Sequence, residues 1–467
     1  MPKFINLDIN HLTQHRVVHY EAGDVLSIAY HKSLKGFGLR FGPIQNFEAW
    51  NLRSLNSSVG LDTYAPSQHF ELDGVALELK SAGDESLELT PYRSGNMLII
   101  RAAHAGSLQA RSSNVKAYQP PDWAYDFWFT TPWPRMSEEN VLSDIASAHQ
   151  HHLAPKVWLL DAGWASHTSY LEFNNDLFPS GNRFLQDMRS MDLRPILWVS
   201  PYIDAKTENW RTFDHNGWLV KDARGKSMIF PVTGDNKDLG SYIDYTSASF
   251  LEYFKTKIAN VAKQGLGGVM FDFGEAFPDD AVLQCTTPSS QTAREQDIVG
   301  HNWYVGEIKR VLHEIAEPLG LCIISRSGWT DSYAHTGLWL GDQSSDASRF
   351  AGLESVTWGY KTAHDAGYRF IGMDTGGYFG FPTLKDYKRW LDLSVTMPFT
   401  MLHGALQSDP WEEGSEALTH YRKCHELHQE IWKKPHEVAL RFSTAPKEVK
   451  ITTIKANDYT FVNDVST

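Results

Sequence analysis

From residue 123 to residue 407 the sequence repeats one pattern, in which a short apolar run suited to a buried strand precedes a segment with helix-like spacing. Eight parallel strands that alternate with helices predict an α/β fold, the (β/α)8 TIM barrel, with its pocket at the carboxyl ends of the strands. An open doubly wound sheet would alternate similarly, but no glycine-rich phosphate fingerprint follows the first run. The eight apolar runs cover residues 126–130, 157–160, 195–199, 269–273, 321–325, 338–341, 370–373 and 397–402.

Helix signals lie between these runs. Ser137 stands where an N-cap is expected, and Glu138 and Glu139 follow in the first turn, where carboxylates complement the helix dipole. Another helix is expected around residues 184–191. In residues 247–264 the apolar spacing predicts one buried stripe, formed by Phe250, Phe254, Ile258 and Val261.

The sequence predicts three regions. Residues 1–121 contain short alternating stretches at 75–80, 85–90 and 96–101, separated by turn-forming residues, and predict an antiparallel β-sandwich domain that ends at Pro120-Pro121. Residues 122–420 are expected to form the barrel, the catalytic domain. Residues 421–467 predict a helix followed by a short β-containing segment, or partial β-domain.

Composition limits the partners of this chain. With 42% hydrophobic residues and a net charge of −13, the chain is typical of a globular protein that binds neither nucleic acid nor an anionic membrane. No signal peptide and no run of ~18 apolar residues is visible, so a cytoplasmic location is expected unless a leader was removed. Cys285, Cys322 and Cys424 are too scattered to predict a disulfide framework or a zinc site. A homo-oligomer is compatible with the sequence.

Two segments place a carboxylate where an apolar strand run ends. They are GVMFDFGE at 268–275, with Asp272 and Glu275, and TGLWLGDQ at 336–343, with Asp342. An acid at such a position has little structural reason to exist unless it faces a ligand. Two acids on one rim of a barrel are the minimum needed to break a glycosidic bond.

The residues that end the other strands extend this pattern. The predicted rim consists of Asp161, Trp198, Asp272, Arg326, Asp342, Asp374 and His403. Acids and arginine bind neutral hydroxyls, whereas a phosphate site would need several cations. A catalytic metal is not predicted, because the acids lack paired-ligand spacing. A serine hydrolase is disfavoured because Ser325 and Ser327 lack a Gly-x-Ser-x-Gly elbow. No cofactor is implied.

At these residues the sequence resembles glycoside hydrolase family 31, the retaining α-glycosidases, over about residues 123–404. One residue departs from the family pattern, because Met401 stands where members commonly carry arginine. Most members are also longer, with two β-domains after the barrel. The motifs that carry the resemblance are WLLDAGW (158–164), ILWVSPY (196–202), FDFGE (271–275), SRSG (325–328), WLGD (339–342), GMDTGGY (372–378), and Pro398-Phe399 leading to His403.

The resemblance implies a role for each rim residue. Asp272 would be the nucleophile that forms a covalent glycosyl-enzyme, with Glu275 as a rival. Asp342 would be the general acid and then the general base, its pKa raised by the apolar surroundings of Trp339. Hydroxyls of the sugar would be held by Asp161, Arg326, Asp374 and His403, and Trp164, Trp198 and Trp339 would line the subsite.

The expected substrate is a small oligosaccharide or glycoside with a terminal α-linked hexose of the glucoside or galactoside type. The DFGE tetrad and the GDQ triplet also resemble those of α-xylosidases and sulfoquinovosidases, which remain alternatives. A sulfonate would need a cation in the loop after the second strand, where only His167 is available. A non-catalytic carbohydrate-binding protein is a further alternative, motivated by Met401.

Overall fold

The computed structural model describes the strands between residues 3 and 104 and most of the chain after residue 115. Side chains are described in the second part only. The described ranges there are 116–165, 171–231, 239–274, 281–284, 300–327, 332–347, 352–365, 367–404, 409–445, 448–456 and 459–461.

Eight parallel strands form one sheet, as the alternating pattern predicts. Every neighbouring pair in the sheet order β19-β18-β17-β16-β12-β11-β10-β20 is parallel. Its two edges meet just beyond β19, where Met401 bonds to the backbone of Met373 and Thr375 at 2.8 and 2.7 Å, which nearly closes the barrel. The strands are β10 (Phe127–Thr131), β11 (Val157–Leu160), β12 (Arg194–Val199), β16 (Gly268–Phe271), β17 (Cys322–Ser325), β18 (Gly337–Trp339), β19 (Ile371–Gly372) and β20 (Thr400–Leu402).

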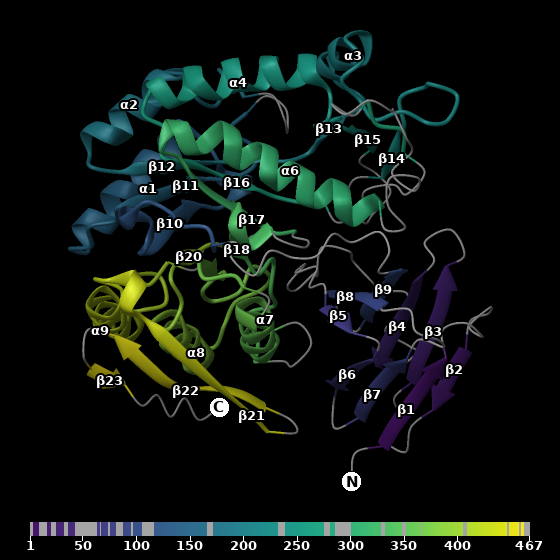
Figure 1. Ribbon diagram of the computed structural model, residues 1–467. Helices are drawn as coiled ribbons and strands as arrows, with labels where there is room; N and C mark the ends of the chain where they lie inside the picture. The colour runs from purple at the N-terminus through teal and green to yellow at the C-terminus, as the bar shows by residue number, and fades with distance from the viewer. Residues whose placement is uncertain are drawn as a thin grey trace.

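Helices cover the outside of this barrel. In Figure 1, α2, α4 and α6 lie on one side of the strands, and α7, α8 and α9 lie on the opposite side. The connection between β17 and β18 is short and contains the 3-10 helix Ser332–Ala334. The helices are α1 (Glu138–Gln150), α2 (Arg183–Ser190), α4 (Ala248–Lys263), α6 (Gly300–Ala316), α7 (Leu353–Asp365), α8 (Leu384–Ser394) and α9 (Ser415–Ile431).

Local sequence explains where several helices begin. A serine or threonine hydroxyl accepts a hydrogen bond from the backbone N–H three residues later, as an N-cap does. Ser137 caps α1 in this way at 3.2 Å, as predicted. The same bond is formed by Thr207 of α3 (Glu208–His215), Ser247 of α4 and Thr383 of α8.

The third strand is followed by a long excursion before α4. It contains α3 and a small antiparallel sheet in the order β13-β15-β14. The strands of this sheet are β13 (Tyr202–Asp204), β14 (Phe230–Pro231) and β15 (Leu239–Tyr242). The excursion accounts for part of the length by which this barrel region exceeds a typical ~250-residue barrel.

Helix α9 spans the predicted boundary between the barrel and the C-terminal region. The predicted boundary at residues 420 and 421 falls inside α9, which begins at Ser415. His425 of this helix bonds to Asp126 beside β10 at 2.7 Å, so α9 packs on the barrel as its last helix. An antiparallel sheet follows, formed by β21 (Ala439–Ala445), β22 (Glu448–Ala456) and β23 (Tyr459–Phe461).

The N-terminal region is rich in strands, as the sequence predicts. One sheet has the antiparallel order β2-β3-β4-β9-β8-β5, and a second has the order β1-β7-β6. Strand β1 pairs with β7 in parallel, which the antiparallel prediction did not include. The sandwich itself remains a proposal. The strands are β1 (Lys3–Asp8), β2 (Arg16–His19), β3 (Val25–His31), β4 (Gly36–Gly42), β5 (Thr63–Ala65), β6 (Ser67–Leu72), β7 (Val75–Lys80), β8 (Leu87–Ser94) and β9 (Met97–His104).

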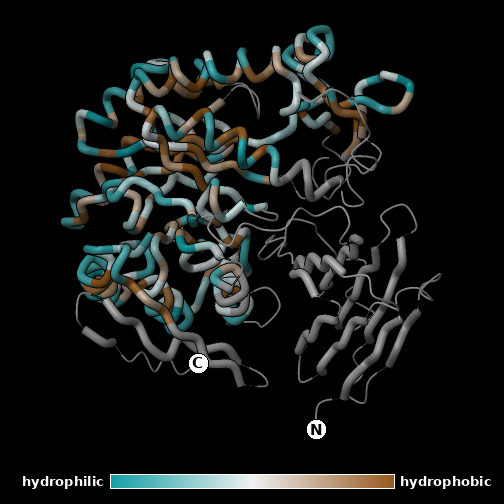
Figure 2. The backbone as a smooth tube through the Cα atoms, viewed as in Figure 1, coloured by the Kyte–Doolittle hydropathy of each residue, from teal (hydrophilic) through white to brown (hydrophobic). Residues whose placement is uncertain are grey.

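The core lies between the barrel strands and the inner faces of the helices. Figure 2 shows hydrophobic segments concentrated on the strands and hydrophilic ones on the outer turns of the helices. The stripe predicted for α4 is buried at all four positions, Phe250, Phe254, Ile258 and Val261. In the part of the chain that the structure describes, no helix has the length and apolarity needed to cross a bilayer.

The α4 stripe gives a stability prediction. Ile258 is buried, and truncating a buried isoleucine to alanine removes apolar contacts and leaves a cavity. We expect Ile258→Ala to lower the free energy of unfolding by ~2–5 kcal/mol. Asn260→Ala, on the exposed face of the same helix, should change it by less than ~0.5 kcal/mol. Urea unfolding of both variants measures this difference, and equal losses would contradict the assigned face.

Candidate active site

Asp272 follows directly after β16 and is held by three donors. Trp198 Nε1 donates to Oδ2 at 3.0 Å, and the backbone N–H of Phe273 donates to Oδ1 at 2.7 Å. Arg326 Nη1 contacts the same Oδ1 at 3.1 Å. Three donors stabilise the ionised form of a buried carboxylate. These three contacts favour the ionised form of Asp272 and fix its carboxylate at the barrel rim.

The backbone after Asp272 adopts a costly conformation. Phe273 has φ 59°, in the left-handed region that non-glycine residues seldom occupy. Ser327 Oγ donates to Phe273 O at 2.8 Å, and a Cβ on Gly274 would lie only 2.8 Å from that same hydroxyl oxygen. Backbone strain of this kind persists where the surroundings enforce it, and it clusters at functional sites.

Asp342 lies three residues after β18 and has a different environment. Its carboxylate is mostly buried, and Oδ2 lies 3.6 Å from Arg326 Nη1. Burial raises the pKa of Asp342 well above 3.8; Arg326 opposes this shift, while Asp272 and Asp374 add to it. The two acids that the sequence singles out therefore meet at one arginine, and burial makes Asp342 hold its proton more readily than an exposed carboxyl group does.

Arg326, the residue after β17, lies between the two acids. Its side chain is 1% exposed, and the guanidinium carbon is 4.5 Å from the centre of the Phe273 ring and 5.5 Å from that of Trp339. Its Nη1 contacts both Asp272 and Asp342. The family resemblance predicts a contact with sugar hydroxyls for this residue, and the structure in addition pairs it with both acids.

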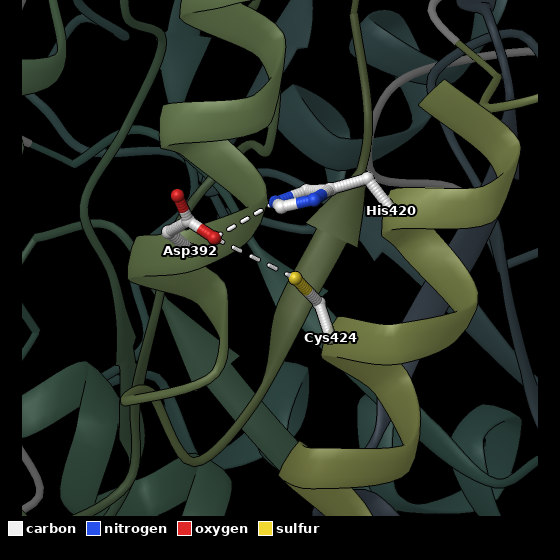
Figure 3. A group of neighbouring side chains, drawn as sticks. All are labelled: Asp392, His420 and Cys424. Atoms are coloured by element: carbon white, nitrogen blue, oxygen red, sulfur yellow. Dashed lines mark hydrogen bonds and ion pairs between the residues drawn. The ribbon is translucent and has the colours of Figure 1, made fainter. Parts of the chain in front are cut away.

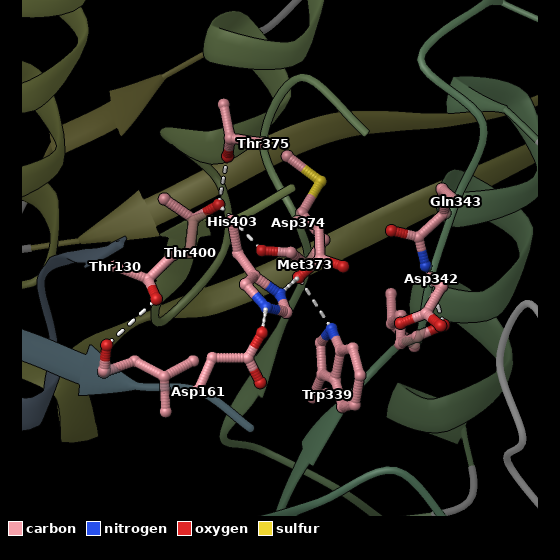
Figure 4. A network of polar contacts seen from close by, with 12 residues as sticks. Thr130, Asp161, Trp339, Asp342, Gln343, Met373, Asp374, Thr375, Thr400 and His403 are labelled. Atoms are coloured by element: carbon pink, nitrogen blue, oxygen red, sulfur yellow. Dashed lines mark hydrogen bonds and ion pairs between the residues drawn. The ribbon is translucent and has the colours of Figure 1, made fainter. Parts of the chain in front are cut away.

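A second charge network crosses the rim at His403, which follows β20 (Figure 4). Its Nδ1 is 3.1 Å from Asp374 Oδ1, and its Nε2 is 3.0 Å from Asp161 Oδ2. Burial by itself lowers the pKa of His403, but Asp374 and Asp161 outweigh it and hold this pKa well above 6.5. Burial raises the pKa of Asp374 to about 6. His403 is therefore a buried cation that donates to both carboxylates.

The three predicted tryptophans are buried and act through their indole N–H groups. Trp164 Nε1 donates to Trp198 O at 2.8 Å, and Trp198 in turn donates to Asp272. Trp339 Nε1 donates to Asp374 Oδ1 at 2.8 Å. Trp198 and Trp339 lie within β12 and β18 rather than after them. They orient the acids, and stacking of a sugar on their faces remains a proposal.

Tyr378 is a site residue that the sequence prediction missed. Its ring is 4.9 Å from the His403 ring, and its backbone N–H donates to Gln343 O at 2.8 Å. Burial and the surrounding acids, Asp161 and Asp342 foremost, raise the pKa of the Tyr378 phenol. The hydroxyl therefore stays protonated among the carboxylates. The GMDTGGY motif contains this residue, but Tyr378 lies beyond the strand end, where position alone does not predict a side chain that faces the site.

Three further positions, Glu275, His167 and Met401, are named from the sequence. Glu275 and His167 lie outside the described residues. Met401 is buried in the barrel wall.

Two buried oxygens at the rim, Asp374 Oδ2 and Gln343 Oε1, have no hydrogen-bond partner. An unpaired buried acceptor costs ~1–3 kcal/mol, so both oxygens would gain from a ligand that donates hydrogen bonds. The described rim residues form no group that converges on a metal ion.

A nearly closed parallel barrel with acids, an arginine and a histidine at the carboxyl ends of its strands defines a TIM-barrel protein with its site at the usual rim. The family description "Glycosyl hydrolases family 31 TIM-barrel domain" matches residues 117–431. The chain belongs to this family, as the motifs predict. The matched region ends at the last residue of α9.

Curated relatives are similar over long stretches. An α-xylosidase of Emericella nidulans is 23% identical over 424 residues, which are 85% of this chain and 53% of that protein. A sulfoquinovosidase of Escherichia coli is 26% identical over 259 residues, which are 53% of this chain and 37% of that protein. The chain thus spans about half or less of the length of these relatives.

Solved structures bear on the fold. A family 31 sulfoquinovosidase from E. rectale, solved with an aza-sugar inhibitor, aligns with a TM-score of 0.61 at 13% identity. The alignment covers 91% of this chain and 75% of that chain. At this identity the likeness supports the barrel architecture alone.

The His403 network gives a pH prediction. The folded pKa values of His403 and Asp374 both lie above their ordinary values, so at these two groups the folded state binds more protons than the unfolded chain. The Asp374 contribution is lost as pH rises from 3.8 to about 6. That of His403 is complete below pH 6.5 and is lost as pH rises through its folded pKa. The free energy of unfolding should therefore fall as the pH rises through the folded pKa of His403.

His403→Gln tests this prediction. Because two buried carboxylates would lose their cation, we expect the free energy of unfolding at pH 7 to fall by ~3–5 kcal/mol. The part of the alkaline decline that comes from the imidazole should be absent in the variant, and the part that comes from Asp374 should move to higher pH, because His403 lowers the pKa of Asp374. Denaturant unfolding from pH 5 to pH 9 measures both effects. An unchanged alkaline slope in His403→Gln would show that another group causes it.

Proposed function

We propose that this chain is the catalytic part of a retaining α-glycosidase that acts on a terminal α-linked sugar through a covalent glycosyl-enzyme. The observation that carries the proposal is the difference in environment between two acids that contact the same arginine. Three donors favour the ionised form of Asp272, whereas burial raises the pKa of Asp342. Acids with opposed environments are the arrangement that glycoside hydrolysis requires.

In the first step Asp272 attacks the anomeric carbon as the glycosidic C–O bond breaks. Asp342 transfers its proton to the leaving oxygen, so the aglycone departs as an alcohol. In the second step Asp342, now ionised, takes a proton from water as the water oxygen attacks the anomeric carbon. The bond to Asp272 breaks, and both carboxyl groups return to their starting states.

The spacing of the acids favours retention over inversion. Retaining enzymes hold the two carboxyls ~5–5.5 Å apart, and inverting enzymes hold them ~6.5–9.5 Å apart to admit a water. Asp272 and Asp342 both contact Arg326 Nη1, at 3.1 and 3.6 Å. Because one nitrogen atom contacts both carboxylates, their separation supports the shorter distance, which is that of retaining enzymes.

The rest of the rim suits a neutral sugar. Asp161, Asp374 and the protonated Tyr378 hydroxyl offer acceptors and a donor, and Asp374 Oδ2 is unpartnered. We propose a terminal hexoside as substrate, of the glucoside or galactoside type. The relatives named α-xylosidase and sulfoquinovosidase keep those two activities as alternatives. We also propose that the chain is divided into the three regions 1–121, 122–420 and 421–467, and that the protein is located in the cytoplasm.

The nucleophile is tested by Asp272→Asn. An amide cannot form the glycosyl ester, so kcat/KM for an aryl α-glycoside should fall by at least ~10⁴-fold. Glu275→Gln is the matched control and should fall much less. A mechanism-based glycosyl label should be trapped by the wild type and not by Asp272→Asn. If Asp272→Asn still traps the label, Glu275 is the nucleophile instead.

The acid is tested by Asp342→Asn with leaving groups of different acidity. The loss should be ~10²–10⁴-fold for a poor leaving group and smaller for an activated aryl group, which departs without a proton. In the wild type kcat/KM should fall as pH rises through the raised pKa of Asp342, because the acid form is lost. This alkaline limb should be absent in Asp342→Asn. Equal losses for all leaving groups would exclude the acid role.

The substrate is tested with four aryl α-glycosides: glucoside, galactoside, xyloside and sulfoquinovoside. We expect the highest kcat/KM for one of the two neutral hexosides, because the described rim places a single arginine among several carboxylates. A preference for the sulfoquinovoside would reverse this choice. Binding without turnover of any of the four would instead identify a carbohydrate-binding protein.

A further inference from the structure

Three potential metal ligands meet on the outside of the barrel, between α8 and α9 (Figure 3). Asp392 lies on α8, and His420 and Cys424 lie four residues apart on α9. Asp392 Oδ1 is 2.8 Å from His420 Nε2 and 3.8 Å from Cys424 Sγ. One ligand atom from each residue lies within 4.8 Å of the other two.

We propose that Asp392, His420 and Cys424 bind one divalent transition-metal ion of the zinc type. Thiolate, imidazole and carboxylate are the three ligand types that proteins use for zinc. Residues at i and i+4 share one helix face, so His420 and Cys424 reach the same point from α9. Bond lengths of ~2.0–2.3 Å around a tetrahedral ion separate ligand atoms by roughly 3–4 Å. The 3.8 Å between the carboxylate and the thiol lies in this range, and the 2.8 Å hydrogen bond between the carboxylate and the imidazole would lengthen by about half an ångström when an ion replaces its proton.

The exposure of the three residues fits a site that is open on one side. The side chains of His420 and Asp392 are 21% and 45% exposed, whereas Cys424 is buried beneath them. An ion can therefore enter from solvent, and water can complete a fourth position. An ion held this way would connect α8 to α9, the two helices that flank β20 in the chain.

A hydrogen-bonded pair of Asp392 and His420, without the cysteine, is the simpler alternative to a metal site. One turn earlier on the same two helices, Lys388 pairs with Glu416, so the seam already carries a polar contact. Asp392 with His420 would extend that seam as a second pair. A cysteine directed at the same carboxylate oxygen is not needed for such a pair, since a thiol is only a weak donor. The third group points to coordination.

Binding has a definite proton balance. Burial and the nearby Asp392 raise the pKa of the Cys424 thiol to about 12, so without an ion the sulfur is protonated. The ion replaces that proton, which is released to solvent as the metal–sulfur bond forms. A thiolate and a carboxylate then neutralise the dication, with His420 as a neutral ligand through Nε2. This binding is independent of the proposed hydrolysis.

Titration of the full chain with cobalt(II) tests the site directly. A thiolate ligand gives a sulfur-to-cobalt charge-transfer band, and tetrahedral coordination gives intense visible bands. We expect both bands to saturate at one ion per chain. Cys424→Ser should abolish the charge-transfer band, and Asp392→Asn should weaken affinity at least ~10-fold. Glu416→Gln, which alters the neighbouring pair on the same seam, is the matched control and should bind like the wild type.

Thermal unfolding tests the same site without relying on absorption bands. An ion that binds only the folded chain raises its melting temperature, so zinc should raise that of the wild type and of Glu416→Gln. The rise should be lost in Cys424→Ser. If Cys424→Ser keeps the charge-transfer band, or if the wild type shows neither bands nor a zinc-dependent rise, the site does not exist. Unaltered glycosidase activity in Cys424→Ser would separate this result from the proposed function.

Discussion

The site depends on one buried guanidinium. Arg326 lies at the end of β17, between β16, which leads to Asp272, and β18, which leads to Asp342. Two carboxylates so close together and so buried could not both stay charged without a cation, because desolvation and mutual repulsion would force a proton onto one of them. The arginine reduces this penalty unequally, since it lies nearer to Asp272 than to Asp342. The separate roles proposed for the two acids rest on that asymmetry.

The second network applies the same principle on the other side of the rim. His403 lies between Asp374 and Asp161, so one cation again balances two carboxylates. Indole N–H groups link the networks to the barrel wall, through Trp198 at Asp272 and Trp339 at Asp374. Large aromatic side chains thus serve as fixed donors among buried carboxylates. The rim is a set of paired charges held by the strands themselves.

Much of the fold and of the site was predictable, because both follow from local pattern. Apolar runs and N-caps predict strands and helices, and parallel strands bring their carboxyl ends to one rim. Asp161, Asp272, Asp342 and Asp374 were therefore identifiable by position alone. Tyr378 was not, because it lies beyond a strand end in a turn whose direction depends on the bond to Gln343. The contact of Asp392 with α9 was equally unpredictable, since helix packing decides it.

The sequence by itself determined the barrel, the acids at its rim and the family to which the chain belongs, because periodicity and motifs are properties of neighbouring residues. The tertiary structure alone decided how those acids differ. Whether a carboxylate is ionised depends on its burial and on donors from strands far away in the chain, such as Trp198 and Arg326 around Asp272. Those distances exist only after the barrel has closed.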